Sequence, residues 1–419
     1  MAPVIVKAAD APKWLSPFME RLGGKMLLRA NYTESASGAA AKELFVDVQD
    51  LFENSPLQPE LVERRFSRIV GHCIPHKCKR LVYLDDPGSR AMAEAIRARI
   101  GEDVALVSVN ELNADLSSNK TNDGGTVVVA GAVCSGRSLL AVSQALRFAQ
   151  PNGIVNYVIG VARTPNQDAL REIRSNATYG DHPDEHGFFV MEQAFVPITR
   201  PGNVTVWDEE AELLKKLLEE EPEGAASKEL EFRLQVLNRS SSNEQRGLVD
   251  NLFWLTRAGH PLELRTGFTF FNFVYAAGTI SQADVYFSVA AVLHGLRLDG
   301  ASERSLRRHE RRRRVISPRC FDRFNDGVVQ AAYLRAALPS ELDYSTSPDV
   351  SDEMAQVLEF ILGHDEDSAG EASREFLFAL ALRRLRLTNR ALARLVEKHG
   401  SESGDAVATA LWKEIEQSI

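Results

Sequence analysis

A strand, a loop rich in Gly and Ser, and a helix follow one another in residues 125–147, GTVVVAGAVCSGRSLLAVSQALR. The small and β-branched residues at its start are typical of a buried strand in a parallel sheet. The first N–H groups of a helix have no partner within the helix, and the helix dipole attracts anions to them. We therefore expect the loop to hold a phosphate group. The predicted phosphate-binding residues are Ser135, Gly136, Arg137 and Ser138.

A similar strand, turn and helix are predicted for residues 81–93, LVYLDDPGSRAMA. The backbone N–H groups around Ser89 and the guanidinium of Arg90 suit a diphosphate. Asp85 and Asp86 lie in the turn between the strand and the helix. These two residues are the predicted catalytic residues.

Arg163 follows an apolar segment at 155–161 within the sequence GVART. Open α/β sheets bind ligands at the carboxyl edge of their strands, and a strand at 155–161 places Arg163 at that edge. Arg163 is therefore a candidate phosphate ligand. An ion pair with Asp168 or Glu172 is the alternative.

The elements that position these residues alternate between strand and helix up to about residue 207, which predicts an α/β unit with a mainly parallel sheet. The predicted strands are 43–52, 79–84, 104–109, 126–129, 155–161, 187–198 and 203–206, and the helices between them are 59–72, 89–100 and 139–148. From residue 208 an acidic helix is followed by further helices, 245–256 among them. The predicted domains are an α/β domain at 1–207, an acidic linker or helix at 208–228, and a helical, Arg-rich domain at 229–419.

Over about residues 40–205 the chain resembles the type I phosphoribosyltransferases. In that family a strand ends in two acidic residues, which hold the ribose and help to position Mg²⁺. A Thr/Ser-Gly-x-Thr/Ser loop follows and holds the 5-phosphate of phosphoribosyl pyrophosphate. Ser135, Gly136 and Ser138 match the loop, whereas Ala130 and Gly131 stand where the family has its acidic pair. The resemblance implies a phosphoribosyltransferase-like sheet, a ribose-phosphate or nucleotide ligand, and Mg²⁺ as the cofactor.

Loss of the acidic pair leaves three interpretations open. The site binds a ribose phosphate or nucleotide without chemistry, it cleaves a related nucleotide with other residues, or the fold serves only as a scaffold. Phosphoribosyltransferase-like domains fused to other modules also occur in bacterial conflict and anti-phage systems, including retron-type ones. The resemblance therefore implies an effector or regulator that works with a partner protein or nucleic acid.

The strongest basic segment is 303–314, ERSLRRHERRRR, with a local charge of +5. A second, looser arginine cluster covers 383–394. Such segments bind nucleic acid phosphates or an acidic partner protein. The alternative is a solvated helix face paired with the acidic helix at 208–223. The predicted contacts are Arg307, Arg308, Arg311, Arg312, Arg313 and Arg314.

Three further segments combine polar and aromatic groups. The segment 72–78, HCIPHKC, contains two thiols and two imidazoles, but its spacing is not that of a zinc finger and favours a helix end with core cysteines. The segment 181–186, DHPDEH, predicts either a solvated turn or a metal or base site. The segment 321–326, together with Gln330 and Arg335, mixes polar groups into an apolar region and indicates an interface or a ligand site.

The chain has 419 residues and a formal net charge of -9, so we expect no general attraction to nucleic acids or anionic membranes. Its four cysteines are too sparse for a disulfide framework. The sequence contains neither a signal peptide nor an apolar run of about 18 residues. We expect a cytoplasmic protein with no membrane partner.

Overall fold

The fold is described from a computed structural model, and the chain divides into two compact units. Unit 2, the α/β unit, comprises residues 17–27 and 46–198, and unit 1, the helical unit, comprises 1–16, 28–45 and 199–419. The residues that the structure describes are 1–32, 42–53, 60–75, 77–118, 125–150, 153–179, 186–198, 204–239, 246–265, 267–276, 278–300, 305–307, 313–323, 326–400 and 404–417.

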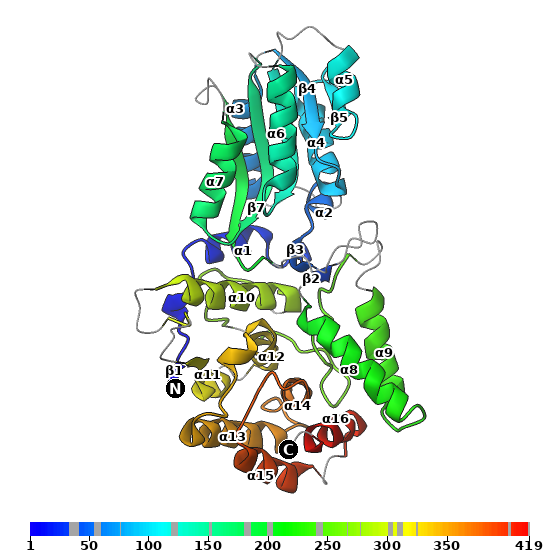
Figure 1. The fold of residues 1–419 in the computed structure, drawn as a ribbon, viewed down its shortest axis with the longest axis vertical. Coiled ribbons are helices and arrows are strands. Elements are labelled where there is room, and N and C mark those ends of the chain that lie inside the picture. Colours follow the sequence, from blue (N-terminus) through cyan, green and yellow to red (C-terminus); the bar gives the residue numbers. More distant parts are fainter. Residues whose placement is uncertain are drawn as a thin grey trace. The chain divides into compact units, whose positions relative to one another are not determined.

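The α/β unit is built on a sheet of five parallel strands in the order β5-β4-β6-β7-β8 (Figure 1). Its two central strands, β6 and β7, are buried along almost their whole length because both faces of the sheet are covered. The strands are β4 (Cys78–Tyr83), β5 (Ala105–Ser108), β6 (Gly125–Val133), β7 (Val155–Thr164) and β8 (Phe188–Phe195). The helices are α1 (Leu15–Leu22), α2 (Val48–Glu53), α3 (Glu60–Cys73), α4 (Pro87–Ile100), α5 (Leu112–Ser118), α6 (Arg137–Ala149) and α7 (Gln167–Ala177).

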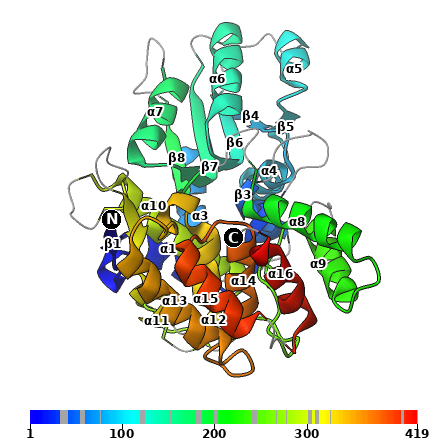
Figure 2. The same cartoon turned by 60° about the horizontal axis from the view of Figure 1, so that its bottom comes forward.

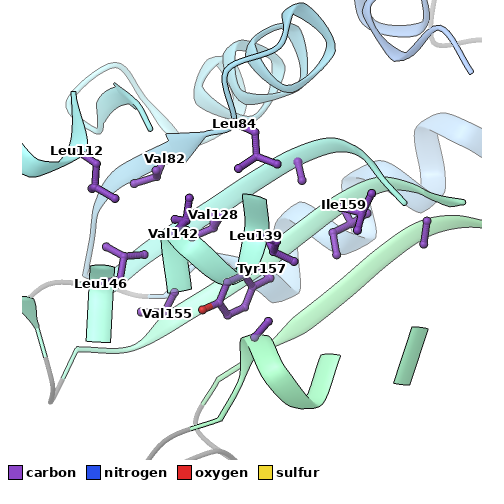
Figure 3. Close-up of a cluster of buried hydrophobic side chains, with 14 of the residues drawn as sticks. Val82, Leu84, Leu112, Val128, Leu139, Val142, Leu146, Val155, Tyr157 and Ile159 are labelled. Carbon is purple, nitrogen blue, oxygen red and sulfur yellow. The ribbon is translucent and has the colours of Figure 1, made fainter. Parts of the chain in front are cut away.

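Alternation of side chains along each strand divides the core of this unit into two layers. On one face, Val128 of β6 and Tyr157 of β7 pack with Leu139 and Val142 of α6 (Figure 3). On the other face, a side chain at Gly131 would point at the first turn of α4. The sheet therefore lies between two helical layers, which is the doubly wound α/β arrangement.

The helical unit is organised around two buried helices, α10 and α12, which pack against each other. A helix that is apolar on every side belongs in a core rather than at a surface. Figure 2 shows helices α11 to α16 gathered in one cluster. The helices are α8 (Val206–Glu220), α9 (Ser227–Arg239), α10 (Gln282–Leu298), α11 (Pro318–Arg323), α12 (Gly327–Ala336), α13 (Pro348–Leu362), α14 (Ser373–Ala381), α15 (Asn389–His399) and α16 (Ala406–Glu416).

The helical unit also includes N-terminal residues, so the division of the chain differs from the predicted domains 1–207 and 229–419. Strand β1 (Ala2–Val4) pairs in parallel with β9 (Arg314–Ile316), which is more than 300 residues away. Strand β2 (Leu28–Tyr32) pairs with β3 (Lys42–Val46), and Ala30 of β2 forms an antiparallel bridge with Leu248. These backbone pairings are long-range, and local periodicity does not reveal them.

Three predicted elements are corrected. The strand predicted at 43–52 divides into β3 and α2. The described residues of the strand predicted at 203–206 form no strand, because 204 and 205 are irregular and Val206 begins α8. The helix predicted at 245–256 is irregular over its described residues. There Arg246 and Gly247 adopt positive φ angles of 44° and 99°, which no α-helix contains, and Leu248 pairs with β2 instead.

Candidate functional site

The two loops predicted to bind phosphate follow β4 and β6, which are neighbouring parallel strands paired up to Tyr83 and Val129. After β4 the chain adds β5 on one side, and it then crosses to add β6 on the other. The strand order therefore reverses between β4 and β6. In open α/β sheets this reversal opens a crevice at the carboxyl ends of the two strands, where ligands bind. The topology thus places the two loops at adjacent strand ends.

The first turn of α6 receives no side-chain cap. Its N-cap is Gly136, in the left-handed conformation with φ 71° and ψ 5°. A Cβ at this position would lie 2.9 Å from the Ile173 side chain, so both conformation and space require glycine. By contrast, Asp86 caps α4 and Asn166 caps α7, each accepting an N–H bond of 2.8 Å. Among these three helices, α6 is the one whose N-cap leaves the helix N–H groups for another acceptor.

The side chains around this helix start are exposed and polar. Ser135, Arg137 and Ser138 face solvent. Within the described part of the chain, the Ser135 and Ser138 hydroxyls form no side-chain hydrogen bond. Two hydroxyls, a guanidinium and the N–H groups of α6 thus surround one position, and all of them can donate hydrogen bonds to an anion.

Arg163 brings a buried positive charge to the same strand ends. It lies at the end of β7, next to β6, and is only 5% exposed. Its guanidinium donates to the Cys134 Sγ at 3.4 Å and to the Pro197 carbonyl at 3.3 Å. The predicted alternative, an ion pair with Asp168 or Glu172, is not formed, and Asp168 pairs with Arg171 at 2.8 Å. No carboxylate of the described residues pairs with Arg163.

The Cys134 contact links Arg163 directly to the loop between β6 and α6. Sequence analysis did not identify Cys134 as part of the site, because the contact joins residues 29 positions apart on two strands. A buried charge normally has a charged partner, since desolvation of an unpaired ion costs several kcal/mol, on the order of 5 or more. The two neutral acceptors leave the charge of Arg163 uncompensated, which favours an external anion beside the loop.

In the second loop, Asp86 and Ser89 bond to each other and to the backbone. Asp86 accepts from the Ser89 N–H at 2.8 Å and from the Ser89 hydroxyl at 2.5 Å. The Ser89 hydroxyl, which is fully buried, also accepts the Gly131 N–H at 2.8 Å. Asp86 therefore holds Ser89 in place, and Ser89 links the start of α4 to β6. Their predicted roles toward a diphosphate stay predictions, and these bonds compete with those roles.

The other two predicted residues of this loop are exposed. Asp85 accepts a bond of 2.7 Å from the Asn110 amide, and Arg90 pairs with Glu94 of its own helix at 2.9 Å. An exposed pair of this kind contributes little to stability, so a ligand can take over either side chain at low cost. Asp85 is thus the better placed of the two candidate carboxylates.

Gly131 explains why one of the two positions of the acidic pair, at the end of β6, holds no carboxylate. A Cβ at Gly131 would lie 2.7 Å from the Gly88 carbonyl carbon and 2.8 Å from the Ser89 nitrogen. On the other side, a Cβ at Gly160 of β7 would lie 2.5 Å from the Gly131 carbonyl oxygen. The backbones of α4, β6 and β7 therefore meet here without room for any side chain. An aspartate or glutamate at position 131 is sterically excluded in this packing.

The donor set is sparse for the implied Mg²⁺. The described residues contain no group of three or more His, Cys, Asp or Glu side chains that could hold a metal ion. Asp85 offers one exposed carboxylate at the strand ends. Protein-bound Mg²⁺ often takes one or two carboxylates and completes its shell with substrate phosphates and water. These residues fit only a Mg²⁺ ion that arrives with a diphosphate.

The arginine-rich segments lie in the helical unit, and their described members differ in their contacts. Arg313 pairs with Asp343 at 3.4 Å, Arg314 belongs to β9, and Arg307 is exposed. Arg308, Arg311 and Arg312 lie outside the described residues. In the second cluster Arg384 pairs with Glu209 at 2.9 Å and Arg394 with Glu359 at 3.1 Å. Helix α8 thus pairs with an arginine of the second cluster. The alternative interpretation paired this helix with the segment 303–314, but Arg313 of that segment pairs with Asp343.

The cysteine and histidine segments yield no site in the described residues. Cys73 is fully buried at the end of α3, and burial raises its thiol pKa to about 12. Burial also raises the pKa of Cys78. His76 and residues 181–185 lie outside the described residues, and His186 accepts the Val155 N–H at 3.2 Å. Cys73 is therefore a core residue, as its sequence context favours.

None of the described helices is both long enough and apolar enough to cross a membrane. Comparison of the chain with protein-family models, with curated proteins and with solved structures gave no match.

Proposed function

We propose that the α/β unit binds a phosphorylated ribose compound, phosphoribosyl pyrophosphate or a nucleotide, where the strand order reverses. The observation that carries this proposal is the buried charge of Arg163 beside the uncapped start of α6. A phosphate group there would accept bonds from the α6 N–H groups and compensate the guanidinium. Both interactions are charge-assisted, and such hydrogen bonds are about twice as strong as neutral ones.

Binding without the standard transfer reaction is the form of this proposal that the geometry favours. The transferase family places two carboxylates against the ribose, and the packing around Gly131 leaves no room for one of them. Of the two carboxylates that could substitute for them, Asp86 already caps α4. The site has protein groups that can bind the phosphate but lacks those that bind the ribose. It would therefore hold the ligand without promoting departure of the ligand's pyrophosphate. This favours a sensor or regulator over a salvage enzyme.

The two ends of α6 offer a matched test by calorimetry with phosphoribosyl pyrophosphate and Mg²⁺. Arg137 is the first residue of α6 and Arg147 lies in its last turn, so each alanine variant removes one positive charge from one end of the helix. Arg137→Ala should weaken binding several-fold, whereas Arg147→Ala should leave it unchanged. If both variants lost the same affinity, binding of the ligand would depend only on the net charge of the protein.

Release of pyrophosphate separates the two forms of the proposal. Binding without release supports sensing, and release that depends on Asp85 supports a divergent transferase. Absence of any binding at millimolar ligand would contradict both forms. The place of the protein in a multi-component bacterial defence system, with a protein or nucleic acid partner, stays a prediction from the resemblance.

A further inference from the structure

A cavity of about 560 Å³ lies in the helical unit between α11, α12 and α13. Its volume is within the range of small-molecule sites, roughly 300–1,000 Å³. One wall is apolar and aromatic, with Phe321, Val357, Phe360 and Ile361, and the rest is polar. The polar residues are Arg319, Asp322, Gln330, Glu353 and Gln356.

Gln330 is the residue that points to a ligand. Its side chain lines the cavity and is only 2% exposed. The amide Nε2 donates to the Phe321 carbonyl at 2.7 Å, whereas the amide Oε1 has no hydrogen-bond partner among the described residues. A buried acceptor without a partner costs about 1–3 kcal/mol. The atom is closed off from solvent, so a ligand donor would reach it once the Gln330 side chain turns toward the cavity.

The aromatic side chains indicate the shape of that ligand. Phe360 is 53% exposed, although it is a large apolar side chain, and its ring lies 4.4 Å from the His364 ring, centroid to centroid. Phe321 lines the same cavity. Exposed and buried aromatic rings suit a planar heterocycle, since stacking and edge contacts with a base contribute about 1–3 kcal/mol. A carboxamide such as Gln330 pairs with the N–H/C=O edge that nucleobases carry.

The charges on the rim exclude a phosphate. Asp322 is exposed, and Glu353 is paired with Arg319 at 2.9 Å. The net charge of the lining is negative, because one arginine faces two carboxylates. Carboxylates accept hydrogen bonds from sugar hydroxyls but repel phosphate groups. We propose that this cavity binds an uncharged nucleoside, with its base against Gln330 and Phe360 and its hydroxyls toward Asp322 and Glu353.

The test is calorimetry of the full chain with adenosine, inosine and uridine, and then with their 5′-monophosphates. We expect at least one nucleoside to bind below millimolar concentration and its monophosphate to bind this site at least 10-fold more weakly. Gln330→Leu and Phe360→Ala should each weaken nucleoside binding about 10-fold or more. Phe232→Ala is the matched control, since Phe232 on α9 is equally exposed at 57% and lies outside the cavity.

The same titrations also distinguish binding in the cavity from binding at the proposed phosphate site. Monophosphate binding that survives Gln330→Leu and is lost in Arg163→Met belongs to the α/β unit. Two results would overturn the inference: no nucleoside binds at millimolar concentration, or the affinity is the same in Gln330→Leu and Phe360→Ala as in the natural chain. A rise in the thermal midpoint of Gln330→Leu without nucleoside binding would show that the cavity holds water only.

Discussion

At the scale of single residues, Gly131 determines which chemistry the strand ends can support. The backbone atoms of Gly88 and Ser89 lie where its Cβ would be, and backbone cannot rotate away as a side chain can. The glycine is therefore a packing requirement, and the missing carboxylate is its consequence.

Gly131→Ala should destabilise the α/β unit by about 1–3 kcal/mol, the usual cost of overpacking. Gly71→Ala is the control, because Gly71 lies within α3 with nothing within 4 Å of its Cβ position. Alanine favours a helix over glycine, so that variant should gain about 0.5–1 kcal/mol. Urea unfolding measures both changes. Equal stability of the two variants would contradict the close packing at Gly131.

The buried thiol of Cys73 makes the free energy of unfolding of the α/β unit depend on pH. Burial raises the pKa of its thiol from an ordinary value of 9.0 to about 12, so the folded chain holds this proton more tightly than the unfolded chain. The resulting stability is present below about pH 9 and is lost as the pH rises toward about 12.

Cys73→Ala should therefore flatten the alkaline loss of stability of the α/β unit. Because buried tyrosines such as Tyr157 also have raised pKa values, some alkaline loss should remain. The measurement is the urea midpoint as a function of pH. If the urea midpoint of Cys73→Ala fell with alkaline pH as steeply as that of the natural chain, the raised pKa of Cys73 would be contradicted.

At the scale of elements, the three helices α4, α6 and α7 start in different ways. Asp86 and Asn166 cap α4 and α7, whereas Gly136 leaves α6 without a side-chain cap. The strand, loop and helix around Gly136 could be predicted from the sequence because local composition determines them. The contacts of Arg163 with Cys134 and of Ser89 with Gly131 could not, since each joins distant strands or helices.

The same limit explains the irregular segment after residue 246. Its apolar residues fit a helical period, but Leu248 pairs with β2, and two positive φ angles at its start exclude a helix. Pairing with a distant strand overrides the local preference. Strands β1 and β2 were likewise not predicted, because their partners lie far away in the sequence.

Asp86→Ala should lower the stability of the α/β unit by about 1 kcal/mol, because it removes the cap of α4. Asp86→Asn should stay close to the natural chain, since asparagine caps as well as aspartate. Asp85→Ala is the control, with an exposed carboxylate outside the helix. The thermal midpoint distinguishes the three. If Asp86→Ala kept the full stability of the natural chain, the capping role would be contradicted. The predicted catalytic role of Asp86 would then be the better account of this residue.

At the scale of the whole molecule, each unit has its own core and its own buried polar network. In the helical unit, Arg335 pairs with Glu210 at 2.6 Å and with Glu375 at 2.8 Å, and Arg233 pairs with Glu210 at 2.7 Å. All four side chains are buried. Burial opposes ionisation of Glu210, but the two arginines outweigh it and hold its pKa below the ordinary value.

Arg335→Leu should destabilise the helical unit by about 3–5 kcal/mol, because it leaves the buried Glu375 without its cationic partner and Glu210 with Arg233 alone. Lys215→Ala should have almost no effect, since it breaks an exposed pair with Glu212. Hydrogen exchange measured along the chain reports each unit separately. The loss of protection in Arg335→Leu should be confined to the helical unit, and equal loss throughout the α/β unit would contradict two independent cores.

The central claim is that Arg163 and the start of α6 hold a phosphate group. Its most direct test is a calorimetric titration of the natural chain and of Arg163→Met with phosphoribosyl pyrophosphate in the presence of Mg²⁺. We predict that the natural chain binds and that Arg163→Met binds about 10-fold or more weakly, since a charged hydrogen bond is lost. Identical affinity of the two proteins, or no binding by the natural chain at millimolar ligand, would contradict the claim.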